Sequence, residues 1–372
     1  MFFSSLRTVN FRNLSDGETF TGAKDIFLVG ENGQGKTNFL EVLYFCAYAS
    51  SFRTVRDSEL ARNGEKDFSA DVKIAQSVND EILVKFEKGK KSILINGKPA
   101  ADRKELLSIA PCIVFCHEDM EFVNGSPERR RWFFDQTLSL YDPVYLEDLR
   151  RYRKVLKSRN TVLKDFARLP FSEKNKIIGN TEQILDALDS QFVMYGQKMM
   201  EKRETAAKQF SEVFGDLYRE VSGIAGINVQ YVQSWKGGKD PASLLREKRS
   251  ADMASGLSLS GPHRDRYIFA HNDYDFTGKA STGQKRLLAL LLRTAQAKRF
   301  SEMTGKNPVF LLDDVLLEMD GEKRRKFLSV MPAYDQAFYT FLPEEPYKHY
   351  CSHPEETLVY NVENGQLKRR TS

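Results

Sequence analysis

The chain has 372 residues, enough for one large domain or two of ordinary size, and 41% of them are hydrophobic, which allows a sizeable core. The net charge of +5 is compatible with a polyanionic partner but does not require one. No segment approaches the roughly 18 consecutive apolar residues of a membrane span, and the first residues lack a signal-peptide pattern, so we expect a cytoplasmic protein with no membrane partner.

Strand and helix patterns alternate through the first 125 residues. Alternating apolar positions over residues 2–11 and the apolar run Asp25–Val29 predict two strands, and a helical pattern follows at Lys36–Tyr48. A further buried strand is predicted at Cys112–Phe115. Three short alternating runs predict an antiparallel meander: residues 68–74, 81–86 and 92–96.

The chain has four cysteines: Cys46, Cys112, Cys116 and Cys351. Together with His117, the middle two resemble half of a metal site. However, they flank the predicted buried strand, and no second pair of ligands appears elsewhere in the sequence. We therefore expect reduced thiols in the core rather than a metal.

Helical periodicity dominates residues 126–223. Apolar residues recur at helical spacing from Tyr145 to Leu163, and over a longer run from Leu185 to Val221. If the longer run is continuous from about Thr181, it forms a rod of roughly 60 Å. Two interpretations follow: amphipathic helices packed against each other, or a helical arm that protrudes from the rest.

Strand patterns return after Gly223, at residues 227–232 and at Val309–Leu312, an apolar run typical of a central parallel strand. The fold class expected is therefore α/β, and the two ends of the chain are expected to build one domain, residues 1–125 and 224–372. This domain would hold a mixed central sheet and an antiparallel β subdomain, with residues 126–223 as an inserted α-helical arm.

The residues after the second predicted strand match the Walker A pattern G-x-x-x-x-G-K-[ST] at every fixed position. Its glycines let the backbone curl around phosphates, and the following helix N-terminus attracts negative charge. We expect Lys36 to reach the β- and γ-phosphates of ATP and the Thr37 hydroxyl to ligate Mg²⁺. The predicted nucleotide-binding residues of this loop are Gly30, Glu31, Asn32, Gly33, Gln34, Gly35, Lys36, Thr37 and Asn38.

Two aspartates follow the run Val309–Leu312, as in a Walker B strand. Asp313 is expected to hold Mg²⁺, directly or through water. Asp314 lies where a general base can orient the attacking water, although it can instead support the groups around the metal. The predicted catalytic residues are Lys36, Asp313 and Asp314.

Ser281, Gly283 and Gln284 precede a strongly helical segment at residues 287–297. Taken alone, they form either a second anion site or an ordinary helix cap. The motif order decides between these interpretations: Walker A, a long insertion, Ser-x-Gly-Gln at a helix start and Walker B is the layout of ABC-type ATPases. In that layout the serine contacts the ATP bound by a partner subunit, so ATP becomes a dimerisation ligand.

With these motifs in place, the sequence resembles the RecF family of bacterial recombination mediators, compact relatives of the SMC-type ATPases. The Walker A loop alone is shared by many families, whereas the Gly-Pro-His-Arg-Asp block at residues 261–265 is much more specific. The resemblance covers nearly the whole chain. Its other segments are residues 10–13, 30–38, 51–54, 118–119, 125–127, 129–131, 135, 281–284, 313–315 and 318–320.

The resemblance implies functions that the residues alone do not. RecF-like proteins act in DNA repair and replication, bind DNA gaps or junctions in an ATP-dependent way, and help to load RecA together with RecO and RecR. They dimerise on ATP, and slow hydrolysis acts as a release switch. By the same resemblance, Arg12 approaches the nucleotide phosphates, and Asp320 lies with Ser281 at the dimer interface.

The sequence departs from the family pattern at several positions. Thr282 and Lys285 stand where the family usually has glutamine, and His117 replaces an expected proline before Glu118. Thr340 is the only candidate where many ABC ATPases carry a switch histidine. These departures concern how the γ-phosphate is sensed rather than the family itself.

Basic residues gather in two places within the predicted arm. For any one of them the alternative is a solvated helix face with extended side chains. As a group they predict phosphate contacts without sequence-specific reading, because no zinc finger, helix-turn-helix or stacking motif appears. The predicted DNA-binding residues are Arg129, Arg130, Arg150, Arg151, Arg153 and Lys154; Arg131, Lys157 and Arg159 belong to the same basic segments.

Other ATPase classes remain as alternatives. A fused nuclease is disfavoured because only about fifty residues follow the Walker B strand, and an SMC-type tether because long heptad repeats are absent. A stand-alone ABC-type ATPase with a non-DNA partner, such as a transporter subunit, stays open. So does a scaffold that binds ATP without hydrolysing it.

Overall fold

The computed structural model describes residues 2–75, 81–235, 240–272, 274–316, 319–345, 347 and 354–370. Glu318 and Cys351, named above, lie outside these ranges. Contacts divide the chain into two units, Met1–Asp119 with Gln296–Ser372, and Met120–Ala295. Residues 224–295, which we assigned to the ATPase domain, thus belong to the same unit as the helical segment, and the predicted domain boundaries stay a prediction.

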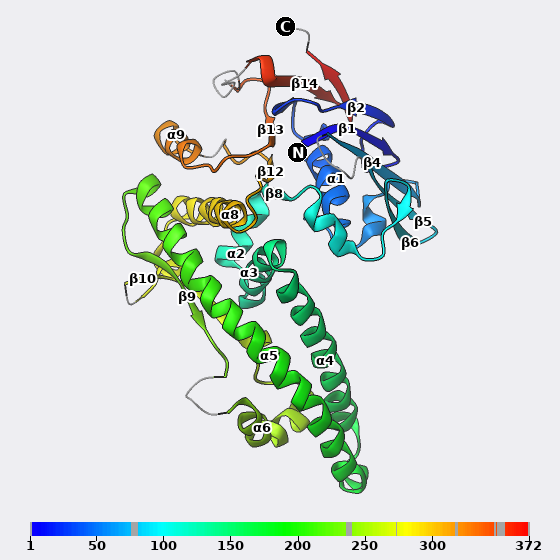
Figure 1. The fold of residues 1–372 in the computed structure, drawn as a ribbon, viewed down its shortest axis with the longest axis vertical. Coiled ribbons are helices and arrows are strands. Elements are labelled where there is room, and N and C mark those ends of the chain that lie inside the picture. The colour runs from blue at the N-terminus through cyan, green and yellow to red at the C-terminus, as the bar shows by residue number, and fades with distance from the viewer. Residues whose placement is uncertain are drawn as a thin grey trace. The chain divides into compact units, whose positions relative to one another are not determined.

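A mixed sheet forms the centre of the first unit (Figure 1). Its strand order is β15-β14-β3-β13-β12-β8, and every neighbouring pair is parallel except β14 with β15. Strands β3, β8, β12 and β13 are buried throughout, as expected for parallel strands covered on both faces. The strands are β3 (Asp25–Val29), β8 (Cys112–Phe115), β12 (Val309–Leu312), β13 (Gln336–Phe341), β14 (Thr357–Glu363) and β15 (Gln366–Arg369).

A second, antiparallel sheet in the same unit has the order β2-β1-β4-β5-β6-β7 and confirms the predicted meander. Helix α1 (Lys36–Tyr48) contacts β4 and β5 of this sheet and β8 and β13 of the central one. This position between two sheets explains why nearly every side chain of α1 is buried. The strands are β1 (Phe2–Val9), β2 (Gly17–Phe20), β4 (Phe68–Ala75), β5 (Glu81–Glu87), β6 (Lys90–Ile95) and β7 (Lys98–Pro99).

The second unit consists mainly of helices. They are α2 (Met120–Asn124), α3 (Pro127–Tyr141), α4 (Pro143–Arg168), α5 (Phe171–Ser222), α6 (Pro241–Ser255), α7 (Phe276–Lys279) and α8 (Thr282–Thr304), the last of which continues into the first unit. Helix α9 (Gly321–Ser329) belongs to the first unit. Short 3₁₀ helices lie at Asp57–Leu60, Arg103–Ser108, His117–Asp119, Pro262–Arg264 and Pro354–Glu356. Within the described ranges, every helix is too short or too polar to cross a membrane.

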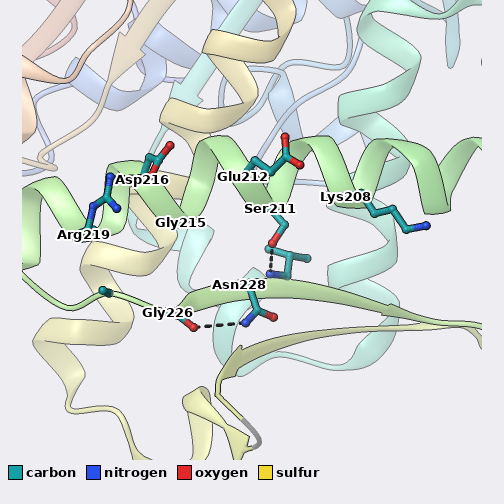
Figure 2. A pocket seen from close by; sticks show the side chains of 10 residues that line it. Lys208, Ser211, Glu212, Gly215, Asp216, Arg219, Gly226 and Asn228 are labelled. Carbon is teal, nitrogen blue, oxygen red and sulfur yellow. Dashed lines mark hydrogen bonds and ion pairs between the residues drawn. The ribbon is translucent and has the colours of Figure 1, made fainter.

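A small sheet packs its edge against α5 in the second unit (Figure 2). Its strands are β9 (Ile227–Val232), β10 (Arg266–His271) and β11 (Tyr274–Asp275), and β9 lies at the edge. Ser211 on α5 accepts a hydrogen bond from the Val229 N–H at 2.8 Å, and a Cβ on Gly215 would lie 2.9 Å from the Ile227 carbonyl oxygen. Helix α5 therefore covers the strand edge, which would otherwise expose unpaired backbone groups.

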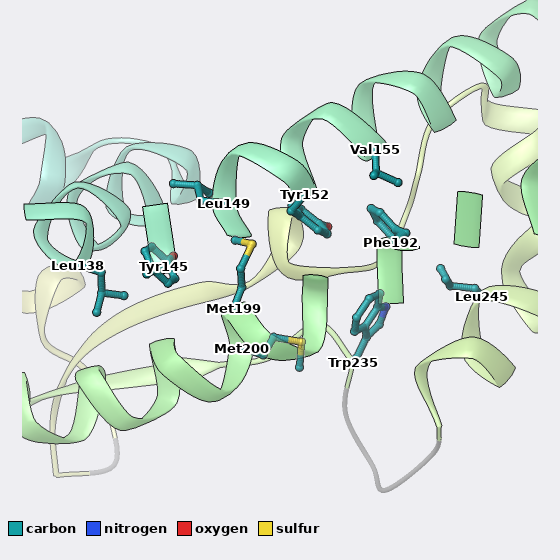
Figure 3. Packing of buried hydrophobic residues seen from close by; sticks show 10 residues of the cluster. All are labelled: Leu138, Tyr145, Leu149, Tyr152, Val155, Phe192, Met199, Met200, Trp235 and Leu245. Carbon is teal, nitrogen blue, oxygen red and sulfur yellow. The ribbon is translucent and has the colours of Figure 1, made fainter. Parts of the chain in front are cut away.

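Helix α5 is continuous over 52 residues, which corresponds to roughly 78 Å. The helix begins at Phe171 rather than near Thr181, so it is longer than the predicted rod. It also packs against α4, as the first interpretation proposed. Figure 3 shows their shared core, in which the Tyr152 ring stacks on Phe192 at 4.9 Å between centroids and Trp235 packs edge-on to Phe192.

Candidate nucleotide-binding site

The two Walker motifs meet at one edge of the central sheet. Strand β13 lies between β3 and β12, and parallel strands present their carboxyl ends at the same edge. The Thr37 hydroxyl donates a hydrogen bond to Asp313 Oδ1 at 2.9 Å, although 276 positions separate the two residues. The two residues predicted to ligate Mg²⁺ are therefore direct neighbours.

The Walker A loop needs its glycines for two different reasons. A Cβ on Gly30 would lie 2.4 Å from the Val362 carbonyl oxygen, and Gly35 adopts a φ of +116°, which L side chains rarely do. Helix α1 begins directly after the loop. The buried Lys36 ammonium donates to the carbonyl oxygens of Gly30 at 2.5 Å and Glu31 at 3.1 Å, so the lysine lies along the loop itself.

Thr340 links the two aspartates that follow β12. Its hydroxyl oxygen accepts the Asp314 N–H at 2.8 Å and lies 2.8 Å from Asp314 Oδ1 and 3.2 Å from Asp313 Oδ1. Burial and the adjacent Asp314 charge raise the pKa of Asp313 to about 6, although hydrogen bonds from Thr37 and Thr340 oppose the rise. Thr340 thus occupies the site, as its position in the sequence suggested.

The side chains gathered here fit a magnesium ion. Mg²⁺ prefers hard oxygen ligands and usually takes one or two from the protein, with water and substrate phosphates completing the octahedron. Thr37 supplies a hydroxyl and Asp313 a carboxylate, and two adjacent carboxylates favour a cation. Three of the four cysteines lie within the described ranges, and these three, Cys46, Cys112 and Cys116, are buried and form no disulfide bond there.

Arg12 lies beside the first helix rather than in open solvent. Its guanidinium makes two hydrogen bonds of 3.0 Å to the Glu41 carboxylate and one of 2.7 Å to the Glu59 carbonyl oxygen. Glu41 is fully buried on α1 and also accepts from Ser51 at 2.5 Å and Arg53 at 3.4 Å. Three of the five guanidinium N–H groups thus donate within the protein, and the contact of Arg12 with phosphate stays a prediction.

Three segments of the family resemblance therefore converge on α1. The Asn38 amide donates to Asn13 Oδ1 and Arg53 donates to Asn38 Oδ1, both at 2.8 Å, while Asn13 donates to the Gly33 carbonyl oxygen at 3.2 Å. Sequence reasoning did not single out Glu41. The sequence does contain a signal for this residue, because Glu41 is the one acidic residue in a helix that is otherwise largely apolar.

The Ser-Thr-Gly-Gln segment forms a capping box at the start of α8. The Ser281 N–H donates to Gln284 Oε1 at 2.8 Å, and the Gln284 N–H donates to Ser281 Oγ at 3.3 Å. Ser281 and Gly283 are exposed, so they are accessible to a partner. Asp320 is exposed as well and caps α9. The helix cap is thus observed, and the role of these residues at a dimer interface stays a prediction.

Two of the arginines in the basic segments have structural roles. Arg159 is fully buried and pairs with Asp189 at 2.7 Å and Asp252 at 2.8 Å, which corrects its assignment to an exposed basic face. Arg130 donates to the carbonyl oxygens of Val123 and Tyr267, and its guanidinium packs on an aromatic ring. Arg130 therefore has a structural role, and its predicted contact with DNA stays a prediction.

The remaining candidates lie on accessible surface. Arg151, Arg153 and Lys154 are exposed on α4, and Arg129 is exposed on α3. Arg150 is half-buried. The groove beside β9 in Figure 2, about 510 Å³, mixes basic and acidic side chains and does not form a site for a polyanion.

The family-specific block at residues 261–265 lies in the second unit, where it is part of a buried ionic network. Arg203, almost fully buried, pairs with Asp265 at 3.1 Å and Asp135 at 2.7 Å. Burial lowers the pKa of His263 to about 4, so this imidazole is neutral at physiological pH. The block thus fixes the packing of the helical unit.

Comparison with known proteins identifies the family. Residues 2–350 match the family model RecF/RecN/SMC N terminal domain. Proteins named DNA replication and repair protein RecF are similar over nearly the whole length: that of Treponema pallidum is 40% identical over 97% of this chain and 99% of its own, and that of Clostridium kluyveri 32% over 99% and 100%. A solved structure of the recombination mediator protein RecF-ATP superposes with a TM-score of 0.87 at 25% identity, covering 100% of this chain and 98% of that one. The chain belongs to the RecF family of the SMC-like ABC ATPases.

Proposed function

We propose that this chain binds ATP and Mg²⁺ at the Walker A loop and uses the bound nucleotide to control its binding to DNA during replication and repair. One observation carries the proposal: the contact between Thr37 and Asp313, with Thr340 and Asp314 beside it, assembles both Walker motifs in one site. The similarity to the solved structure of RecF-ATP supports the choice of nucleotide.

Each side chain of the site has a separate task. Lys36 exchanges the Gly30 and Glu31 carbonyl oxygens for the β- and γ-phosphates, and Thr37 and Asp313 hold Mg²⁺, which neutralises developing phosphate charge. Asp314 orients the attacking water. Hydrolysis is slow and acts as a release switch, in keeping with the family resemblance.

The nucleotide also controls assembly. Ser281 and Gly283, exposed at the start of α8, contact the γ-phosphate bound by a second copy, with Asp320 at the same interface. Two copies thus enclose two ATP molecules. The resemblance further implies that the dimer acts with RecO and RecR and promotes RecA loading indirectly.

DNA binding is electrostatic and independent of sequence. The exposed residues Arg151, Arg153 and Lys154 on α4 contact phosphates, together with Arg129 and the half-buried Arg150. The competing proposal is an ABC-type ATPase whose partner is not DNA. The family match favours DNA, because the relatives are named for DNA replication and repair.

The test measures ATP affinity and ATP-dependent DNA retention on the same samples, for wild type, Lys36→Met and the control Lys98→Met, which removes an exposed lysine from β7. Loss of charge-assisted hydrogen bonds should weaken ATP binding by roughly 10- to 100-fold in Lys36→Met alone and abolish ATP-dependent DNA binding. ATP binding without any DNA binding by the wild type would favour the non-DNA alternative. Unchanged ATP affinity in Lys36→Met would refute the site itself.

A further inference from the structure

The turn that joins the last two strands contacts the apex of the Walker A loop. Asn364 and Gly365 have φ angles of +50° and +79°, the pattern of a tight hairpin turn. The Gly365 N–H donates to the Gln34 carbonyl oxygen at 2.8 Å, and the Asn364 N–H donates to Gln34 Oε1 at 2.6 Å. The end of the chain therefore binds both the main chain and the side chain of one loop residue.

The same turn is fixed on its other side. The Ser15 N–H donates to the Gly365 carbonyl oxygen at 2.9 Å, and a Cβ on Gly365 would lie 1.7 Å from the Asn13 carbonyl oxygen. Asn13 in turn donates from its side chain to the Gly33 carbonyl oxygen at 3.2 Å. The turn is thus wedged between the segment that follows β1 and the loop, and only glycine fits at this position.

These contacts set the direction of the loop's donors. In a planar trans peptide the C=O and N–H bonds point in opposite directions. When the Gln34 carbonyl is bound by the hairpin turn, the N–H of Gly35 must point the other way, and the bond from Asn13 to the Gly33 carbonyl does the same for the N–H of Gln34. A phosphate-binding loop needs its N–H groups to converge on the ligand.

We propose that the Asn364–Gly365 turn is a positioning element for nucleotide binding, which orients the phosphate-binding N–H groups of the Walker A apex before ATP arrives. This inference rests on the proposed ATP site and extends it to residues over 300 positions away. Donors that are already oriented bind without the entropic cost of ordering the loop. The turn therefore acts on affinity, while the groups at Asp313 and Asp314 act on hydrolysis.

The test compares Gly365→Ala with Gly89→Ala. Gly89 lies in the turn between β5 and β6, where Lys88 and Gly89 have φ angles of +51° and +74°, and a Cβ there has no heavy atom within 4 Å. Both substitutions carry similar backbone strain, but only Gly365→Ala collides with Asn13. We expect a KM for ATP roughly tenfold higher in Gly365→Ala than in Gly89→Ala, about the effect of one lost hydrogen bond, with kcat unchanged.

A second measurement needs no variant. Because coupling between two sites is reciprocal, ATP should slow amide hydrogen exchange in the wild-type peptide that covers residues 357–370. Any one of three results would overturn the inference. The two variants could have equal KM values, the effect of Gly365→Ala could be confined to kcat, or ATP could leave the hydrogen exchange unchanged. If Gly365→Ala does not fold, the exchange result decides. Failure of the wild type to bind ATP is a different outcome, which removes the proposed function instead.

Discussion

Thr340 Oγ1 lies 2.8 Å from both the main-chain nitrogen and a carboxylate oxygen of Asp314. Asp314 has a φ of +52°, in the left-handed region that non-glycine residues occupy only when their surroundings hold them there. Strand β13 lies between β3 and β12, so its penultimate residue is near the carboxyl ends of both Walker strands. The hydroxyl of Thr340 contacts Asp314 at both its main chain and its side chain and helps to hold it in place.

Replacing Thr340 by valine keeps the shape but removes the hydroxyl, which leaves the Asp314 N–H and carboxylate without this partner. We expect ATP hydrolysis at saturation to fall roughly tenfold, while ATP affinity stays within about twofold, because binding depends mainly on the loop. Thr340→Ser retains the hydroxyl and serves as the control. Single-turnover hydrolysis and nucleotide titration measure the two quantities. Equal rates for Thr340→Val and Thr340→Ser would show that the hydroxyl has no part in hydrolysis.

Two variants of Ser281 separate its observed cap from its proposed contact with a partner. Ser281→Ala removes the cap acceptor, which costs about 1 kcal/mol of stability and adds no bulk. Ser281→Arg removes the same cap and places a long cation at the exposed helix start. Because the alanine variant also loses the hydroxyl proposed to contact the γ-phosphate, we expect its ATP-induced dimer to be weaker than that of wild type but still detectable by sedimentation. The arginine variant should form no dimer, and both variants should retain nucleotide binding in a titration. A dimer that persists in Ser281→Arg would contradict the interface assignment.

The local motifs of the site were predictable from the sequence, because each is a short pattern of fixed spacing. The Walker A loop, the strand before Asp313 and helix Lys36–Tyr48 were all placed correctly. The hydrogen bonds from Asn364 and Gly365 to Gln34 were not predicted, since no local sequence pattern connects residues that are 330 or more positions apart. Tertiary pairing alone brings them together.

The burial of Arg159 could have been predicted from the spacing of its neighbours in the sequence, although not from the number of charges on the helix. Tyr152, Val155, Arg159 and Leu163 recur at spacings of three and four, which places the arginine on the buried stripe of α4. What the sequence could not supply is the pair of acidic partners, because they come from α5 and α6. The sequence pattern thus shows which face of α4 is buried, whereas the residues that contact this face depend on the tertiary fold.

The exposed basic face of α4 should contribute to the salt dependence of DNA binding. Phosphate contacts release condensed counterions, so each contact adds about −0.9 to the slope of log affinity against log salt on duplex DNA. Replacing Arg151, Arg153 and Lys154 by glutamine should flatten that slope by roughly one unit per lost contact, equally for all sequences. ATP-dependent dimerisation should not change.

The matched control for this face removes the same charge elsewhere. Lys66, Lys88 and Lys90 are exposed in and around the antiparallel sheet, and their replacement by glutamine changes the net charge equally. Titrations of DNA at several salt concentrations compare the two triple variants. If both flatten the slope alike, the effect reflects overall charge, and α4 is only a solvated face.

Asp71 on β4 should make stability depend on pH. Burial and the neighbouring Glu81 charge raise the pKa of Asp71 to about 6, and its Oδ1 has no hydrogen-bond partner. The folded protein therefore binds the Asp71 proton more tightly than the unfolded chain does. As a result, this group lowers the free energy of unfolding as pH rises through that range, and the loss of stability is complete above about pH 6.

The variant Asp71→Asn is neutral at every pH and can still donate to Glu81. We expect its Tm to exceed that of wild type at pH 8 and to approach it at pH 4. Asp67→Asn, a nearby exposed aspartate that accepts the Lys88 N–H, is the control for the amide substitution. Thermal unfolding at both pH values measures the effect. If Asp71→Asn and wild type differ in Tm by the same amount at pH 4 and at pH 8, then Asp71 titrates alike in the folded and unfolded chains.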